Sequence, residues 1–276
     1  MQSRTFIISE CCSSWRFGED HLSNAYRMIL AAKECGADAA KFQWTSDVEE
    51  MARRRNDTNP ANDEILAYPV EWLHKLKAKC DEVGIEFMVT CFLQKDIFRI
   101  APLVERFKVA SAESSDHSFV EAHFQHKKPV IISYAFGVKP PYVPDESRWH
   151  LACTCSYPTP IEQLNLGRLS PKPINEVEMS YALFNGLSDH STSILSGALA
   201  VAGGSVCLEK HCRLINTPTD NPDFGHSLVI EPMLAAPENS FAKYVEFVRL
   251  AEKAMGTGEN VIQECEKANL TRRVKI

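Results

Sequence analysis

The sequence predicts a single α/β domain over residues 1–257, built as a closed parallel (β/α)8 barrel, also called a TIM barrel. Short β-branched or apolar segments alternate with segments of helical spacing along nearly the whole chain. This alternation is expected where each strand of a parallel sheet is followed by a helix. The length of 276 residues also suits one such barrel.

The first elements follow from local patterns. Thr5–Ser9 is a β-branched segment that predicts a strand. In His21–Cys35 the apolar residues recur at helical spacing, and Gly36 provides a helix stop. Ala39–Phe42 predicts the second strand. The polar, arginine-rich segment Thr45–Asn62 has no apolar period, so we interpret it as a long loop.

The middle of the chain continues the alternation. Val70–Val83 predicts a helix, because Pro69 suits its start and Gly84 its end. Ser118 is expected to cap the helix that follows it. The elements after Gly84 are predicted as strand Glu86–Thr90, helix Lys95–Ile100, strand Phe107–Ala110 and helix Phe119–His126.

The last part of the barrel contains one exception. Val130–Ser133 predicts the fifth strand, but Pro140, Pro141 and Pro144 forbid a regular helix over most of Tyr134–Trp149. The fifth helix is therefore expected to be shortened or replaced by a loop. The remaining elements are predicted at Leu151–Thr154, Asn175–Phe184, Gly186–Leu187, Ile194–Val201, Val206–Glu209 and Phe241–Met255, followed by a tail at 258–276.

Composition excludes several classes of function. A net charge of -6 argues against a broad nucleic-acid surface, which requires a basic excess. No apolar segment approaches the roughly 20 residues needed to span a bilayer. The N-terminus has no charged-then-apolar leader, so a cytoplasmic protein is expected, and its 10 cysteines are expected to be reduced.

Polar residues follow the predicted strands where each strand ends. In a parallel barrel these ends meet at one mouth, where reactive groups gather. Packing alone does not explain polar residues at nearly every strand end, so we expect the functional site there. They are Glu10, Lys41, Gln43, Thr90, Lys108, Ser111, Glu113, Ser133, Tyr157, Ser188, Asp189, His190, Glu209, Lys210 and His211.

Three of these residues are lysines that follow apolar strand residues: Lys41, Lys108 and Lys210. Each could instead reach solvent or pair with a carboxylate. Two or more of them converging on one mouth would form an anion site, which serine hydroxyls could complete. Such a site suits a small phosphorylated acid.

Two histidines end neighbouring strands. His190 and His211 could hold a divalent metal ion with open positions, although a single histidine is more often only hydrogen-bonded. A thiolate metal site is disfavoured, because the cysteines near strand ends form no C-x-x-C pair. Those cysteines are Cys11, Cys12, Cys91, Cys153, Cys155 and Cys212. The other histidines are expected to be structural or solvated: His21, His74, His117, His123, His126, His150 and His226.

The strand-end motifs resemble those of one known family, in order and across nearly the whole chain. They are Gly36–Gln43 (GADAAKFQ), Phe107–Glu113 (FKVASAE), Lys128–Ser133 (KPVIIS), Tyr157–Pro160 (YPTP), Gly186–Ser191 (GLSDHS), Leu208–His211 (LEKH) and Asp223 followed by Ser227. The chain resembles the N-acetylneuraminate (sialic acid) synthase family, which includes relatives that make legionaminic and pseudaminic acids.

The resemblance implies an activity: a metal-assisted condensation of phosphoenolpyruvate with an N-acyl amino-sugar aldehyde. The product would be a nonulosonic 2-keto-3-deoxy acid. His190 and His211 would bind Mn²⁺ or Mg²⁺, and Glu10 would orient the aldehyde or move a proton. The residues implied for phosphoenolpyruvate are Lys41, Thr90, Lys108, Ser111, Ser133 and Ser188. Those implied for the sugar side are Tyr157 and Asp223, supported by Gln43 and Glu113.

The chain departs from the family pattern on the sugar side. The family follows its first-strand Glu with a Gly and an Asn-His pair, whereas Glu10 here precedes Cys11–Trp15. Tyr134–Phe136 stands in place of a Thr-Gly-Met. The tail resembles the start of a linker to a small antifreeze-like domain that, in the family's dimer, covers the partner's site. A homodimer is therefore a further expectation.

Two rival interpretations remain open. A Schiff-base aldolase would use Lys41, Lys108 or Lys210 as its amine nucleophile. A non-catalytic binding protein would keep the barrel without the reaction.

Overall fold

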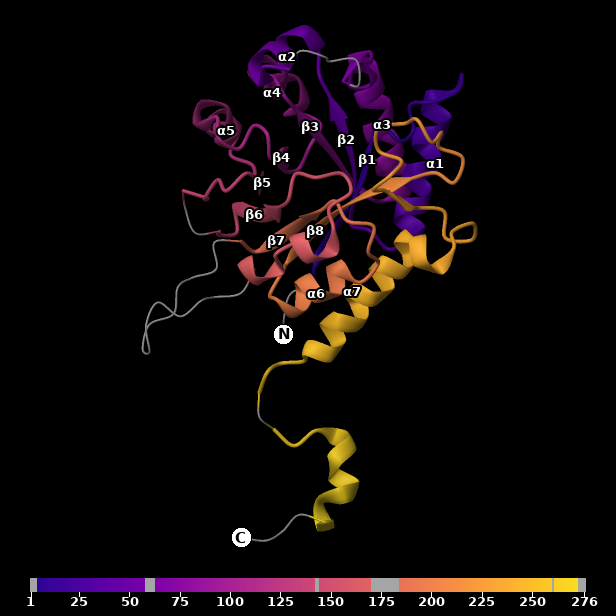
Figure 1. Ribbon diagram of the computed structural model, residues 1–276, viewed down its shortest axis with the longest axis vertical. Coiled ribbons are helices and arrows are strands. Elements are labelled where there is room, and N and C mark those ends of the chain that lie inside the picture. Colours follow the sequence, from indigo (N-terminus) through magenta and orange to yellow (C-terminus); the bar gives the residue numbers. More distant parts are fainter. Residues whose placement is uncertain (1–3, 58–62, 142–143, 170–183, 260, 273–276) are drawn as a thin grey trace.

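The computed structural model describes residues 4–57, 63–141, 144–169, 184–259 and 261–272. Within them, eight parallel strands form a barrel with helices around it, which confirms the predicted fold class (Figure 1). Hydrogen bonding connects the strands in the order β3-β2-β1-β8-β7-β6-β5-β4, and contacts between β3 and β4 close the barrel. The strands are β1 Phe6–Cys12, β2 Ala39–Trp44, β3 Glu86–Cys91, β4 Phe107–Val109, β5 Val130–Tyr134, β6 Arg148–Cys153, β7 Gly186–Asp189 and β8 Cys207–Arg213.

The strand register brings the predicted site residues together. Glu10 lies opposite Lys41 on one neighbouring strand and opposite His211 on the other. On the far side of β8, Glu209 lies opposite Ser188. A short strand that was not predicted, β9 Leu228–Val229, pairs with the end of β8. This pairing holds the loop between β8 and β9 near the mouth.

The helices agree with the predicted alternation. Val70–Val83 (α3) and Phe241–Met255 (α7) have the predicted bounds. The predicted helix Asn175–Phe184 lies outside the described residues, apart from its last residue. The remaining helices that were predicted are α1 His21–Glu34, α4 Gln94–Ile100, α5 His117–Phe124 and α6 Ser196–Ala202. Short 3-10 helices that were not predicted are Glu64–Leu66, Ile161–Gln163, Leu166–Arg168, Pro237–Asn239 and Glu264–Arg272.

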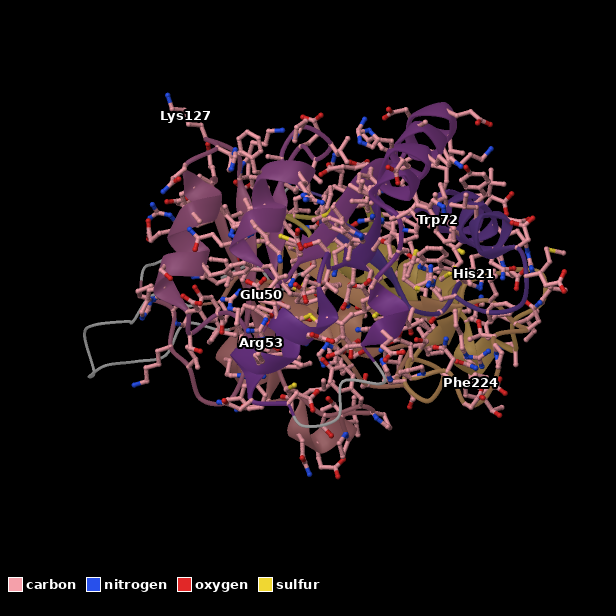
Figure 2. All side chains as sticks on the ribbon, turned by 90° about the horizontal axis from the view of Figure 1, so that it is seen from above. His21, Glu50, Arg53, Trp72, Lys127 and Phe224 are labelled. Carbon is pink, nitrogen blue, oxygen red and sulfur yellow. The ribbon has the colours of Figure 1, made fainter. Side chains whose placement is uncertain are left out.

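The segment Thr45–Asn62 is not all loop, which corrects the prediction. It contains helix α2, Val48–Arg55, whose N-cap Asp47 accepts a hydrogen bond from the Glu50 backbone N–H. Glutamates occupy its first turn and arginines its last, which suits the helix dipole. Only Met51 and Ala52 are buried, so the helix has no apolar period to detect. In Figure 2, α2 with the labelled Glu50 and Arg53 lies in front of the barrel strands.

Two further details concern the start of helix α5 and the connection between β5 and β6. Asp116 caps α5 by accepting a hydrogen bond from the Phe119 N–H, so the predicted cap at Ser118 is wrong. Ser118 instead donates its hydroxyl hydrogen bond to Asp116. Between β5 and β6, residues 135–141 and 144–147 contain no helix, as the prolines predicted.

The core has two layers. Inside the barrel, an apolar cluster that includes Ile8, Met88 and Leu151 fills the amino-terminal half. A larger cluster packs the outside of the strands against the helices. A Cβ atom at Gly186 would lie 2.6 Å from the Cys207 carbonyl oxygen, so only glycine fits where β7 approaches β8. Because apolar side chains fill the amino-terminal half of the barrel, the polar side chains of the interior lie at the carboxyl-terminal mouth.

The C-terminal segment lies apart from the barrel in Figure 1, and the described side chains of residues 261–269 are exposed. Among the helices of the described residues, none is both long and apolar enough to cross a membrane.

Candidate active site

A cavity of about 810 Å³ opens at the carboxyl ends of the strands. Of the residues predicted for the site, it is lined by Gln43, Ser111, Glu113, Tyr157, His211 and Asp223. The other predicted residues are Glu10, Lys41, Thr90, Lys108, Ser133, Ser188 and His190, and all of these are buried.

Lys41 and Lys108 converge on one carboxylate, that of Glu209. Lys41 Nζ lies 3.1 Å from Glu209 Oε1, and Lys108 Nζ lies 3.4 Å from Glu209 Oε2. Lys41 also pairs with Glu10. The two lysines therefore share a buried ion-pair network with two glutamates, and the net formal charge of these four side chains is zero.

Hydroxyl groups complete this network. Lys41 donates to Thr90 Oγ1 at 3.1 Å, and Lys108 donates to Ser133 Oγ at 2.8 Å. Ser188 donates to Glu209 Oε2 at 2.8 Å. The Thr90 and Ser133 hydroxyl groups accept here and can still donate to a ligand, whereas Ser188, which donates to Glu209, can accept from one. Glu209 was among the strand-end residues but was given no role, although it joins both lysines.

Lys210 does not belong to this group. Side chains alternate along a strand, so Glu209 and His211 face the barrel interior while Lys210 faces outward. Lys210 Nζ lies 3.0 Å from Asp189 Oδ2 and 5.6 Å from the centre of the Tyr244 ring on α7. It therefore stabilises the layer between barrel and helices.

The network shifts the pKa values of its members. Burial disfavours the charge on Lys41, but Glu10 and Glu209 outweigh it and raise the pKa of Lys41. For Lys108 burial prevails over the attraction of Glu209 and lowers the pKa. Burial opposes ionisation of Glu209 as well, yet Lys108 and Lys41 hold its pKa below the ordinary range.

The two predicted metal ligands, His190 and His211, are neighbours, with ring centres 5.3 Å apart and ring planes at 74°. His190 Nδ1 lies 3.0 Å from the Thr154 carbonyl oxygen, which only accepts hydrogen bonds. The ring therefore donates from Nδ1, and Nε2 keeps its lone pair, 3.5 Å from Ser188 Oγ. Burial and the neighbouring His211 lower the pKa of His190, which favours the neutral form that binds metals.

Asp223 lies beside two histidines. His211 Nδ1 and His226 Nε2 each lie 3.2 Å from Asp223 Oδ1, yet neither nitrogen has a hydrogen bond of good geometry. His226 was expected to be structural or solvated; it is buried, and it lines the cavity. Its ring lies 4.6 Å from His211 and 4.8 Å from Tyr157, centre to centre. No spacing in the sequence indicates this, because the loop after β8 brings His226 back to the mouth.

One thiol also lies among these residues. Among the described residues, Cys12, His211 and Asp223 form a group whose potential ligand atoms are all within 4.8 Å of one another. Packing was the expected role for Cys12, and it is buried as expected, but it is buried beside groups that bind metals.

The outer rim of the cavity is formed in part by α2. Arg55 contacts Glu113, with Nε 2.8 Å from Oε1, and lies 3.6 Å from Asp63. Arg54 contacts Asp116 at 2.6 Å. Glu113 is thus held by a guanidinium group, which fits the supporting role predicted for it.

Comparison with known proteins identifies relatives. A family model described as the NeuB family matches residues 28–139 and 145–260. Pseudaminic acid synthase of Campylobacter jejuni is 31% identical over 95% of this chain and 78% of its own length. Human N-acetylneuraminate-9-phosphate synthase is 29% identical over 97% of this chain and 76% of its own length.

The fold is also found in solved structures. The sialic acid synthetase of Leptospira borgpetersenii, in complex with citrate, aligns with a TM-score of 0.78 at 24% identity, covering 99% of this chain and 92% of that one. Both of these sequence relatives are named as synthases, so the predicted enzyme class and the predicted family resemblance are confirmed. The chain belongs to the NeuB family.

Proposed function

We propose that this protein condenses phosphoenolpyruvate with an N-acyl amino-sugar aldehyde to give a nonulosonic 2-keto-3-deoxy acid and phosphate. The observation that carries the proposal is the adjacency of two groups at one mouth. Lys41 and Lys108 meet at Glu209, and His190 and His211 lie next to each other, joined to Glu209 through Ser188. The names of the matched relatives, which are nonulosonic acid synthases, support the same reaction class.

The histidines fit a divalent cation. His190 Nε2 has a lone pair, because the ring donates from Nδ1, and it lies 3.5 Å from Ser188 Oγ. The buried His211 Nδ1 lacks a well-aligned hydrogen bond beside a carboxylate oxygen. Imidazole and carboxylate ligands suit several divalent ions, and the family resemblance implies Mn²⁺ or Mg²⁺. Such an ion would act as a Lewis acid on the aldehyde oxygen.

Phosphoenolpyruvate would bind above the lysine network. Lys41 and Lys108 would supply positive charge for its phosphate and carboxylate groups, and Ser111 and Ser133 would supply hydroxyl donors. Ser188 would donate to the ligand once its hydroxyl turns away from Glu209. An anion that draws Lys41 to itself would weaken its pairing with Glu10. The Glu10 carboxylate would then be free to orient the aldehyde or to transfer a proton.

The proposed reaction proceeds in two stages. Carbon 3 of phosphoenolpyruvate attacks the aldehyde carbon, and the aldehyde oxygen takes up a proton to become a hydroxyl group. This leaves cationic character at carbon 2, to which water adds with loss of a proton. The bond from carbon 2 to the phosphate oxygen then breaks, the new hydroxyl group passes its proton to the departing phosphate, and the ketone forms. Tyr157, Asp223 and Gln43 line the cavity where the sugar would lie.

Phosphate release tests this function directly. The purified protein is expected to release phosphate from phosphoenolpyruvate only when an N-acyl hexosamine and a divalent metal are both present. Mass spectrometry should then detect the condensed acid. A panel of N-acyl hexosamines, with a chelator as the negative control, identifies the acceptor. Bound metal without phosphate release for any sugar would support the non-catalytic barrel instead.

The Schiff-base alternative has one observation in its favour, the lowered pKa of Lys108. Its amine, however, already donates to Ser133 Oγ and to the Val109 carbonyl oxygen at 2.9 Å. We expect no covalent adduct after borohydride treatment with pyruvate, measured as the mass of the intact protein. An adduct located at Lys41, Lys108 or Lys210 would contradict the proposed mechanism.

A further inference from the structure

The end of β1 carries a cysteine into the metal-ligand group. Cys12 is buried, and one ligand atom each of Cys12, His211 and Asp223 lie within 4.8 Å of one another. The register between β1 and β2 shifts between Glu10 and Cys12, and Cys12 has a φ of 34°. This left-handed conformation is uncommon for a residue with a side chain, and such irregularities re-aim side chains near active sites.

Local hydrogen bonds hold the strained backbone in place. The Cys12 N–H donates to Glu10 Oε1 at 2.8 Å, and the Cys12 carbonyl accepts from Trp15 Nε1 at 2.8 Å. Trp15 is fully buried in the core. The thiol therefore has a defined position beside His211, as a preorganised ligand requires.

Asp223 is oriented in the same direction. Its Oδ2 accepts hydrogen bonds from the backbone N–H of Ser13, at 2.8 Å, and from the Ser13 hydroxyl. Its Oδ1 is therefore left facing His211 and His226, whose ring nitrogens at 3.2 Å have no well-aligned partner. The Asp223 carboxylate oxygen and the His211 nitrogen, which has no aligned partner, lie next to the Cys12 thiol. A cation bound by these three groups would give the His211 nitrogen a partner.

We propose that Cys12 and Asp223 join His211 in a mixed thiolate–imidazole–carboxylate site that selects Zn²⁺, or a similar borderline ion, over Mg²⁺. Thiolate is a soft ligand that Mg²⁺ does not favour, whereas zinc takes sulfur, nitrogen and oxygen ligands together. Three protein ligands leave a fourth position for water or substrate, as catalytic zinc sites do. The inference rests on the proposed cation at His211 and changes both the ion and its ligands, because Cys12 and Asp223 take the place given there to His190.

Cobalt is the probe that reports this ligand set. Metal-free protein titrated with Co²⁺ is expected to bind one ion and to develop a sulfur-to-cobalt charge-transfer absorption in the near ultraviolet. Cys12→Ser should lose this absorption. Cys155→Ser removes another thiol of the same cavity, outside the ligand group, and should keep it. Asp223→Asn should keep the absorption but bind Co²⁺ more weakly.

Affinity for zinc gives a second measurement. Cys12→Ser is expected to weaken Zn²⁺ binding by about 100-fold, because loss of even an outer partner of a metal ligand costs roughly 10–100-fold. Its Mg²⁺ affinity should change little. Wild-type protein that binds Co²⁺ without the charge-transfer absorption would overturn the proposal, whether or not Cys12→Ser folds. The phosphate-release assay is independent of this spectrum. It would therefore still show whether the proposed condensation occurs.

Discussion

His211→Ala is expected to lower kcat for phosphate release by about 1000-fold or more. His211 belongs both to the pair with His190 and to the group with Cys12 and Asp223, so its loss disrupts either ligand set. A bound metal ion supplies several kcal/mol of transition-state stabilisation. About 4 kcal/mol corresponds to roughly three factors of ten in rate. Steady-state phosphate release and the metal content of the purified variant measure the effect.

A second histidine provides the control. His126 lies near Phe107 and Phe98, with ring centres 5.5 and 6.4 Å apart, and it does not line the cavity. His126→Ala should therefore retain both the bound metal and the wild-type rate. A His211→Ala variant with unchanged turnover would remove the metal assignment altogether.

The sequence predicts the position of the site because strand ends are local features. Each short apolar segment that ends in a polar residue can be read without tertiary information, and the barrel topology alone brings the ends together. The neighbouring ends of β7 and β8 were expected to bring His190 and His211 close, and the structure places their rings 5.3 Å apart. The exact bounds of α3 were readable because Pro69 and Gly84 mark them.

What was not predicted depends on tertiary contacts or on which face a residue occupies. Lys210 and Glu209 are adjacent in sequence, and only the alternation of the strand decides which one faces the interior. His226 reaches the mouth because β9 pairs with β8 and turns the loop back. Cys12 lies beside His211 and Asp223, at a register shift in β1 that the sequence around it does not indicate.

Glu209→Ala is expected to reduce the free energy of unfolding by about 3–5 kcal/mol, the usual cost of removing one partner from a buried ion pair. Glu209 contacts Lys41 and Lys108 and accepts from Ser188. Among the described residues, its removal leaves Lys108 without an ion-pair partner and Lys41 paired with Glu10 alone. Denaturant titration by circular dichroism measures this change. Glu246→Gln disrupts the exposed pair with Lys243 and should cost no more than about 1 kcal/mol.

The stabilisation by Glu209 should also depend on pH in a direction that the pKa shift fixes. Burial opposes its ionisation, but Lys108 and Lys41 hold its pKa in the folded state below its ordinary value of 4.5. Protons therefore bind the unfolded state more readily, so the stabilisation is fully present above pH 4.5 and is lost as the pH falls toward the folded-state pKa. The difference in unfolding free energy between wild type and Glu209→Gln should thus be constant near neutrality and shrink under acid conditions. A difference that grows on acidification would mean that Glu209 is protonated in the folded protein, and the ion-pair network that positions both lysines would then be wrong.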